Sequence, residues 1–469
     1  MYPQDSFHPN AQPVKGLPPV TPPSGKFLAQ LFLVPLAIVA GIALVFLTIV
    51  WLFGDVLGGL GGPHTPAQFL EKLDKSNADV RWRAAADLAQ TLLRDEQLAS
   101  NSRFALDIAE RLRKGMDAAA AGEKAVDDRL RKHPYLAERL SKLAQELPDP
   151  ERNADDPNWK ALQDDWKKLE PELNYVQFLS AALGNFSVPA GAPLLNELAM
   201  REPEGVNIIA ALQRRRAVWA LANLGENLKR FDKLPAERQD AILAELEEEA
   251  QGKQTERSRW AQDMLDYLKR RQAGQKQALG VDVALERCAQ DRQDPSLREL
   301  AGFAMGFWEG TPEENRRMDQ ALLRLTSDPG TGDETLAKLL DARSEKDKES
   351  VPVTKKPGSR IHYNAAVALA RRGAAGDYLG LLEEMLDEEA QRDNHRLRRP
   401  NGREDPDEAT ANLTVISALK AVDELHAKRP ELLASRPGLR QAIDKLTGSP
   451  NAAVRAEAKR VQAALDQGK

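Results

Sequence analysis

Apolar residues recur every three or four positions from Ala67 to the end of the chain, and prolines and glycines cluster between these periodic segments. Such spacing places apolar side chains on one face of a helix, and each cluster marks a break between helices. No segment alternates apolar and polar residues for long enough to predict a β-strand. The pattern therefore predicts an all-α body over residues 67–469.

Five of the predicted helices share an arrangement of basic and small residues, called the repeat pattern below. A basic residue is followed three positions later by Ala, and a small and a large apolar residue come three and four positions after that Ala. Small residues three positions apart let a neighbouring helix pack closely. Single copies depart from the pattern, with Asp87 at a small position and His362 at a basic one. The copies begin at Val80-Arg81, Gln213-Arg214, Leu297-Arg298, Ile361-His362 and Val454-Arg455.

Two weaker copies, centred on Ala261 and Val415, give the pattern a period. Equivalent positions are separated by 44 residues from Ala217 to Ala261, 40 from there to Ala301, and 43 from Val415 to Ala458. Periods of about 40–47 residues are typical of repeats built from helical hairpins. Longer spacings between the other copies predict polar insertions near residues 341–360 and 394–410.

These repeats resemble HEAT repeats, specifically the short HEAT-like repeats of phycobilin lyases, in which the shared segment begins the second helix of each hairpin. The resemblance covers residues 67–100 and 175–469, whereas residues 108–172 do not match and are expected to form longer or divergent helices. It implies a right-handed α-solenoid. We expect Asp and Arg near the helix starts to pair between successive repeats; these structural positions are Asp79, Arg81, Asp294, Arg298 and Arg455.

A second kind of hydrophobic pattern precedes the repeats. Residues 27–54 contain no charged side chain, and this run of 28 residues exceeds the ~20 that span a bilayer. It predicts one transmembrane helix, preferred over a cleaved signal peptide because the run is long and begins late in the chain. Lys15 and Lys26 before it and Asp55 after it favour a cytoplasmic N-terminus and an exported body.

The predicted organisation follows from these patterns. Residues 1–26 are rich in proline and are expected to form a disordered tail. The remaining parts are the transmembrane helix at 27–54, a Gly/Pro linker at 55–66, a helical part at 67–172 with the first repeat and divergent helices, and the repeat array at 173–469.

Composition excludes several classes of function. A net charge of -5 argues against nucleic-acid binding, which usually needs a basic excess. The single cysteine, Cys288, rules out an intramolecular disulfide and a cysteine-rich zinc site. The six histidines have no ligand spacing, and neither a phosphate-binding loop nor a nucleophile elbow is present. We therefore expect no catalytic residue, metal, cofactor or small-molecule substrate.

Clusters of arginine are the candidates for contact with a partner. Arg214, Arg215 and Arg216 lie near a predicted helix start, where positive charge is unfavourable beside the helix dipole. This mismatch indicates a partner contact or pairing with acidic residues of an adjacent repeat. The segment from His395 carries a second cluster between acidic stretches, which consists of Arg396, Arg398, Arg399 and Arg403.

Three functions are compatible with the sequence. The favoured one is a membrane-anchored HEAT-repeat scaffold or adaptor, without catalysis, that binds another protein and contacts the membrane through residues 27–54. The alternative is an enzyme or enzyme accessory resembling phycobilin lyases. A HEAT-like nucleic-acid-binding module has least support because of the net charge.

Overall fold

The computed structural model describes residues 65–144, 156–202, 208–252, 255–329, 351–356, 358–399 and 401–467. The chain divides into two units, Met1–His64 and Thr65–Lys469, and every described residue belongs to the second. The predicted tail at 1–26, the predicted transmembrane segment at 27–54 and the linker up to His64 lie outside the described residues.

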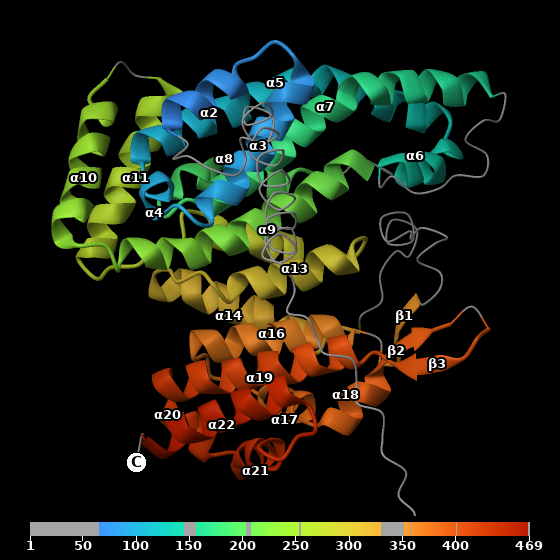
Figure 1. Cartoon of the computed structure of the whole chain (residues 1–469), viewed down its shortest axis with the longest axis vertical. Coiled ribbons are helices and arrows are strands. Elements are labelled where there is room, and N and C mark those ends of the chain that lie inside the picture. The colour runs from blue at the N-terminus through green and yellow to red at the C-terminus, as the bar shows by residue number, and fades with distance from the viewer. Residues whose placement is uncertain are drawn as a thin grey trace, which may run out of the picture. The chain divides into compact units, whose positions relative to one another are not determined.

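Helices make up most of the described chain, which confirms the predicted all-α class (Figure 1). The first part contains α2 (Pro66–Leu73), α3 (Ala78–Leu92), α4 (Glu96–Ala99), α5 (Ser102–Lys132), α6 (Leu136–Ala144) and α7 (Pro157–Asn185). The middle part contains η1 (Pro189–Gly191), α8 (Ala192–Met200), α9 (Ile208–Phe231), α10 (Ala236–Ala250), α11 (Glu256–Gln272), α12 (Val281–Ala289), α13 (Pro295–Met305) and α14 (Pro312–Leu325). The last part contains α16 (Ser359–Arg372), α17 (Leu379–Met385), α18 (Glu388–Asn394), α19 (Glu408–Lys428), α20 (Pro430–Ala434), α21 (Pro437–Leu446) and α22 (Ala452–Gln467).

Local sequence explains where several of these helices begin. Asp294 caps α13, because its carboxylate accepts a hydrogen bond from the amide of Leu297 at 3.0 Å, and Pro295 follows at a position that needs no donor. At α14, Thr311 and Glu314 form a reciprocal capping box. These contacts satisfy amides that the first turn of a helix leaves without partners.

Seven helices pack in succession and are called the first layer. Each of them contacts the next in the order α3, α7, α9, α13, α16, α19, α22, and Figure 1 follows this order from α9 to α22. A second layer lies against them, since α8 packs on α9, α12 on α13, α14 and α17 on α16, and α21 on α22. Within the second layer, α8 contacts α12 and α12 contacts α14.

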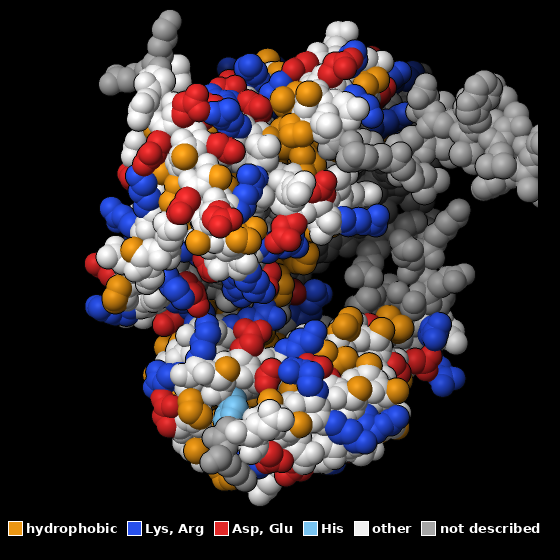
Figure 2. All heavy atoms as spheres, turned by 60° about the vertical axis from the view of Figure 1, so that its left-hand side comes forward, with side chains coloured by type: hydrophobic (Ala, Val, Ile, Leu, Met, Phe, Trp, Pro, Cys, Tyr) orange, Lys and Arg blue, Asp and Glu red, His pale blue; other side chains and the backbone are white. Residues whose placement is uncertain are grey.

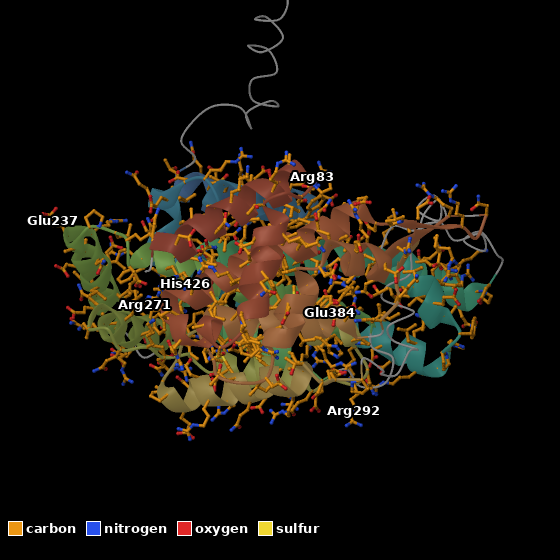
Figure 3. The ribbon with its side chains drawn as sticks, turned by 90° about the horizontal axis from the view of Figure 1, so that it is seen from below. Arg83, Glu237, Arg271, Arg292, Glu384 and His426 are labelled. Carbon is orange, nitrogen blue, oxygen red and sulfur yellow. The ribbon has the colours of Figure 1, made fainter. Side chains whose placement is uncertain are left out.

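The repeat pattern supplies the buried contacts of the first layer. Its central alanines Ala217, Ala301, Ala365 and Ala458 are all fully buried. The copy at Ala261 differs from our expectation. It lies on α11, which packs against α10 and α5 instead of joining the first layer. Figure 3 shows this pair of helices with Glu237 of α10 and Arg271 of α11 labelled.

Glycines bring the layers' backbones together at particular points. An added Cβ at Gly184 of α7 would lie 2.7 Å from the backbone oxygen and 3.0 Å from the Cα of Ala220 in α9. An added Cβ at Gly306, which caps α13, would lie 3.1 Å from the Cα of Ala368 in α16. Ala220 and Ala368 are small positions of the repeat pattern, so both sides of these contacts require small residues.

A small sheet was not predicted from the sequence. Strands β1 (Val351–Thr354), β2 (His395–Arg398) and β3 (Glu404–Pro406) form an antiparallel sheet in that order, with Thr354 opposite His395 and Arg398 opposite Glu404. The two segments expected as polar insertions thus meet in one sheet, although residues 341–350 lie outside the described part.

The structure corrects the predicted membrane localisation. Across the described ranges of 65–467, no helix is both long enough and apolar enough to cross a bilayer. The longest, α5 and α7, have 31 and 29 residues, but charged side chains occur along α5 and in the first half of α7. The sequence-based expectation of a single-pass membrane protein with a transmembrane helix at 27–54 and an exported body is therefore withdrawn.

Candidate functional site

Aromatic side chains form a row across the first layer, defined here as Trp82, Phe178, Trp219, Phe303 and Phe307. Trp82 of α3 stacks on Phe178 of α7 with ring centroids 5.8 Å apart and planes 19° apart. Trp219 of α9 stacks on Phe303 of α13 at 5.7 Å and 9°. Phe303 in turn meets Phe307 edge to face at 4.9 Å. The ring contacts therefore form two groups, one joining α3 to α7 and one joining α9 to α13 and the turn after it.

The row is partly exposed to solvent and has at one end an arginine, Arg371, which is ion-paired with Glu424 at 3.4 Å. Trp219 is 50% exposed although it stacks on Phe303, so the packing contact and an accessible surface coexist at this residue. The guanidinium of Arg371, from α16, lies 4.6 Å from the ring centre of Phe307 and 5.8 Å from that of Phe303. Exposed aromatic rings beside arginine are typical of protein-binding surfaces.

A cavity of about 320 Å³ adjoins the other end of the row, between α3, α7 and α9. It lies where two hydrophobic clusters meet without merging. Trp82 and Phe178 pack against the main cluster, whereas Trp166, Leu173 and Ile209 belong to a second cluster built around α5, α6 and α7. The polar side chains in its lining are Glu170, Asn174, Gln177, Gln213 and Arg216.

Arg216 brings a positive charge to this cavity. Burial lowers the pKa of its guanidinium to about 10, which is still far enough above neutral pH to keep the side chain protonated. Among the described residues its guanidinium makes no hydrogen bond or ion pair. Because Arg216 precedes Trp219 by one helical turn, the cavity and the aromatic row share one face of α9.

Trp166 adds a second group without a partner. Its side chain is 94% buried, since only 6% of its surface is exposed, and its indole N–H has no hydrogen-bond partner within the described part of the chain. Gln213, equally buried, is different because it donates to Glu123 and accepts from Arg201, both at 2.7 Å. Unsatisfied buried donors are costly, so a ligand that accepts from Trp166 would gain free energy.

The predicted partner-binding residues Arg214 and Arg215 are engaged inside the chain. Arg214 is buried and ion-paired with Asp291, and Arg215 binds both carboxylate oxygens of Asp294 at 2.6 and 2.8 Å. Helix α9 begins at Ile208, so the arginine run lies beyond its first turn and the argument from the helix dipole does not apply.

The arginines of the second predicted cluster lie on or beside the β2–β3 hairpin, and each has an acidic neighbour. Arg396 pairs with Asp393 at 2.7 Å, Arg398 with Glu404 at 2.8 Å, and Arg399 and Arg403 with Asp405 at 3.0 and 2.9 Å. All of these pairs are at least partly exposed, so their charges are largely compensated locally and screened by water.

The predicted structural positions take part in contacts at helix starts. Asp79 accepts a hydrogen bond from the indole of Trp82 at 3.1 Å, and Arg81 pairs with Glu172 of α7. Arg298 of α13 is buried and binds Asp328, which follows α14, with contacts of 2.5 and 2.6 Å. Arg455 donates to the backbone oxygen of Ser449.

Cys288 is a free cysteine and is buried. Burial raises the pKa of the Cys288 thiol to about 11, so the thiolate that would act as a nucleophile is scarce at neutral pH. Within the described ranges, no group of three or more His, Cys, Asp or Glu side chains is placed to hold a metal ion.

The sequence identified the run Arg214-Arg215-Arg216, but it did not show that Arg216 is the one that lines the cavity. The spacing of Arg216 and Trp219, three residues apart on one helix, was the available indication. Trp166 gave no such indication, because its unsatisfied N–H depends on the packing of α7. No protein-family model matches the chain, and a search of curated proteins finds no match either.

Proposed function

We propose that residues 65–467 form a right-handed, HEAT-like α-solenoid that serves as a scaffold and binds another protein along the first layer. The observation that carries this proposal is the aromatic row, with Trp219 half exposed and Arg371 beside Phe307. Trp, Tyr and Arg dominate binding energy at protein interfaces, where they cluster in the centre of the contact.

The arrangement of helices supports the solenoid part of the proposal. Each first-layer helix packs on the next, and second-layer helices pack behind them, as in arrays of stacked helical hairpins. The α10–α11 pair and the β1–β2–β3 sheet are then insertions between repeats. Such arrays bind partners over extended surfaces and need no catalytic group.

Charge favours a protein partner over a nucleic acid. Lys and Arg side chains are interspersed with Asp and Glu over the face drawn in Figure 2, so that face carries no broad basic area. Phosphate backbones are held chiefly by such areas. An enzyme accessory of the phycobilin-lyase type has no specific observation in its favour.

Site-specific photo-crosslinking tests the proposal. We would replace Trp219 with p-benzoylphenylalanine, and replace Val283 in the same way as the control. Val283 lies on α12 of the second layer and is 45% exposed, so the two positions offer similar accessibility on different layers. We expect position 219 to crosslink to a discrete partner protein and position 283 not to do so.

Binding measurements with that partner complete the test. Trp219→Ala should raise the Kd at least tenfold, or about 1.4 kcal/mol, and Val283→Ala should leave it unchanged. The proposal fails if position 219 gives no adduct, if both positions capture the same proteins, or if the two alanine variants bind alike.

A further inference from the structure

The cavity between α3, α7 and α9 offers two different kinds of surface to a ligand. Trp82, Phe178, Leu173, Ile209 and Leu212 supply aromatic and aliphatic walls. A bulky apolar side chain placed against them would leave water and gain free energy with the area it buries. Polar groups occupy the rest of the lining, so the cavity suits a ligand that is apolar in one part and polar in another.

Among the polar groups of the lining, Arg216 favours an anion. Arg216 differs from the two arginines before it, since Arg214 and Arg215 are paired with Asp291 and Asp294. No acidic neighbour raises the pKa of Arg216; burial alone acts on it, and it lowers that pKa. The fixed fork of a guanidinium binds a carboxylate through two parallel hydrogen bonds.

Trp166 provides an independent indication of an acceptor. Its N–H is buried and unpartnered, and the residue lines the same cavity as Arg216. An N–H donor of this kind is satisfied by an oxygen atom of the ligand. Asn174 and Gln177 bring further amide donors to the lining.

We propose that this cavity receives a side-chain carboxylate, from Asp or Glu, together with the bulky apolar side chain next to it, in an acidic segment of the partner protein. The inference rests on the proposed scaffold function and names the feature of the partner that the surface selects. The carboxylate would lie against Arg216 and the apolar side chain against Trp82 and Phe178.

Glu170 explains why a carboxylate fits better than a phosphate group. It is the acidic side chain in the lining of this cavity. A phosphate monoester carries about −1.5 to −2 charges and would be repelled more strongly than a carboxylate with a single charge. The apolar walls disfavour free inorganic anions, which would lose hydration without gaining contact.

The test uses fluorescein-labelled peptides and the full chain, with binding followed by fluorescence anisotropy up to millimolar protein. The probe is Gly-Ser-Gly-Glu-Phe-Gly-Ser-Gly, and two control peptides carry Gln instead of Glu or Ala instead of Phe. We expect the probe to bind at least tenfold more tightly than either control. Equal affinity for all three peptides overturns the proposal.

Variants of the protein identify the groups responsible. Arg216→Gln should remove the preference for Glu over Gln, and Trp166→Phe, which removes the indole N–H but keeps an aromatic side chain, should weaken probe binding several-fold. The matched control is Arg292→Gln, because Arg292 is exposed, is labelled in Figure 3 and loses the same charge. If Arg216→Gln and Arg292→Gln bind the probe alike, the assignment is wrong.

Competition and folding controls complete the design. Inorganic phosphate that displaces the probe more effectively than acetate would overturn the choice of a carboxylate. Thermal melting reports whether each variant is folded. If Arg216→Gln does not fold, Trp166→Phe and the peptide series on the unaltered chain still decide the question.

Failure of this inference can be separated from failure of the scaffold function. If position 219 crosslinks to a partner and that partner binds Arg216→Gln with unchanged Kd, the cavity proposal is wrong and the scaffold stands. If position 219 has no partner and the probe does not bind, both are wrong.

Discussion

Single atoms control how closely the first-layer helices approach one another. The hydrogen of Gly184 lies against the backbone of Ala220, and that of Gly306 against Ala368, where a Cβ would be 2.7 to 3.1 Å from the nearest atoms. Backbone on the opposing side cannot move aside as the end of a flexible side chain can. The tightness of these contacts therefore makes the small residues of the repeat pattern necessary.

Gly184→Ala should destabilise the fold by about 1–3 kcal/mol, because the added methyl overpacks the contact between α7 and α9. Urea unfolding followed by circular dichroism measures this. Gly380→Ala is the matched control, since its Cβ would meet only the flexible end of Arg436 at 3.5 Å. It should be neutral or slightly stabilising. Equal stability of the two variants would show that the contact is not tight.

Leu297→Asp should destabilise the fold by at least about 3 kcal/mol, because it places an unpaired charge in the contact of α13 with its neighbours. Leu297 is fully buried, as is Ala301 one turn later, where Ala301→Arg should act similarly. Leu413→Asp makes the same exchange at a residue that is 63% exposed and should change stability by less than about 0.5 kcal/mol. Unchanged thermal melting of Leu297→Asp would contradict this packing register.

Ion pairs connect α9 to the turn before α13, and α13 to the turn after α14. Arg214 and Arg215 reach from α9 to Asp291 and Asp294, in the turn before α13, and Arg298 reaches from α13 to Asp328. Asp291 and Asp294 lie in the same turn, so two ion pairs hold this turn against α9. Burying an ion pair costs desolvation energy, so these pairs add little net stability. Their larger effect is to specify how α9 and α13 pack on their neighbours.

Asp291→Ala should destabilise the fold by about 3–5 kcal/mol, because it leaves the buried charge of Arg214 without a partner. The double variant Arg214→Met with Asp291→Leu should regain most of that loss, because no charge is then buried. Glu286→Ala breaks the more exposed pair with Arg324 and should cost at most about 1 kcal/mol. Similar losses for Asp291→Ala and Glu286→Ala in chemical denaturation would argue against this account.

At the level of elements, the sequence predicted helices well and missed the sheet. Apolar periodicity extends over many residues in each helix, whereas β1, β2 and β3 have only three or four residues, too few for alternation to be recognised. Pairing of β1 with β2 also joins segments far apart in the chain. The copy of the repeat pattern at Ala261 is helical and buried, but α11 packs on α10 and α5 and does not join the first layer.

Across the whole described unit, a few charged groups connect segments distant in sequence. Glu309, after α13, pairs with Lys276, after α11, and with Lys428 at the end of α19, the latter at 3.1 Å. Burial alone would raise the pKa of Glu309. The hydrogen bond from Lys276 and the charge of Lys428 lower it by a larger amount, so the net pKa is about 2.

Acid should therefore weaken the fold partly through Glu309. Because its pKa is lower in the folded than in the unfolded chain, its contribution to stability is complete above the ordinary Glu value of about 4.3 and is lost as the pH falls from there toward 2. The free energy of unfolding of the unaltered chain should exceed that of Glu309→Gln at neutral pH, and the difference should shrink on acidification. A difference that is constant with pH would contradict the assignment.

The candidate site was only partly accessible to prediction. The run Arg214-Arg215-Arg216 is visible in the sequence, but the sequence does not show which of these arginines are paired. The fold brings acidic residues 77 and 79 positions away to Arg214 and Arg215, and within the described part of the chain it brings none to Arg216. Likewise, Trp219 and Phe303 meet only because α9 packs on α13. A single sequence supplies residue types and helix faces, whereas pairing across helices requires the three-dimensional arrangement.

The succession of first-layer helices has a mechanical consequence. Since each of these helices packs on the one before and the one after, a small rotation at one contact would be passed on to the later helices. Four such contacts separate α3, which carries Trp82, from α16, which carries Arg371. Small rotations at these four contacts would add together, and their sum would set the distance between the two ends of the aromatic row.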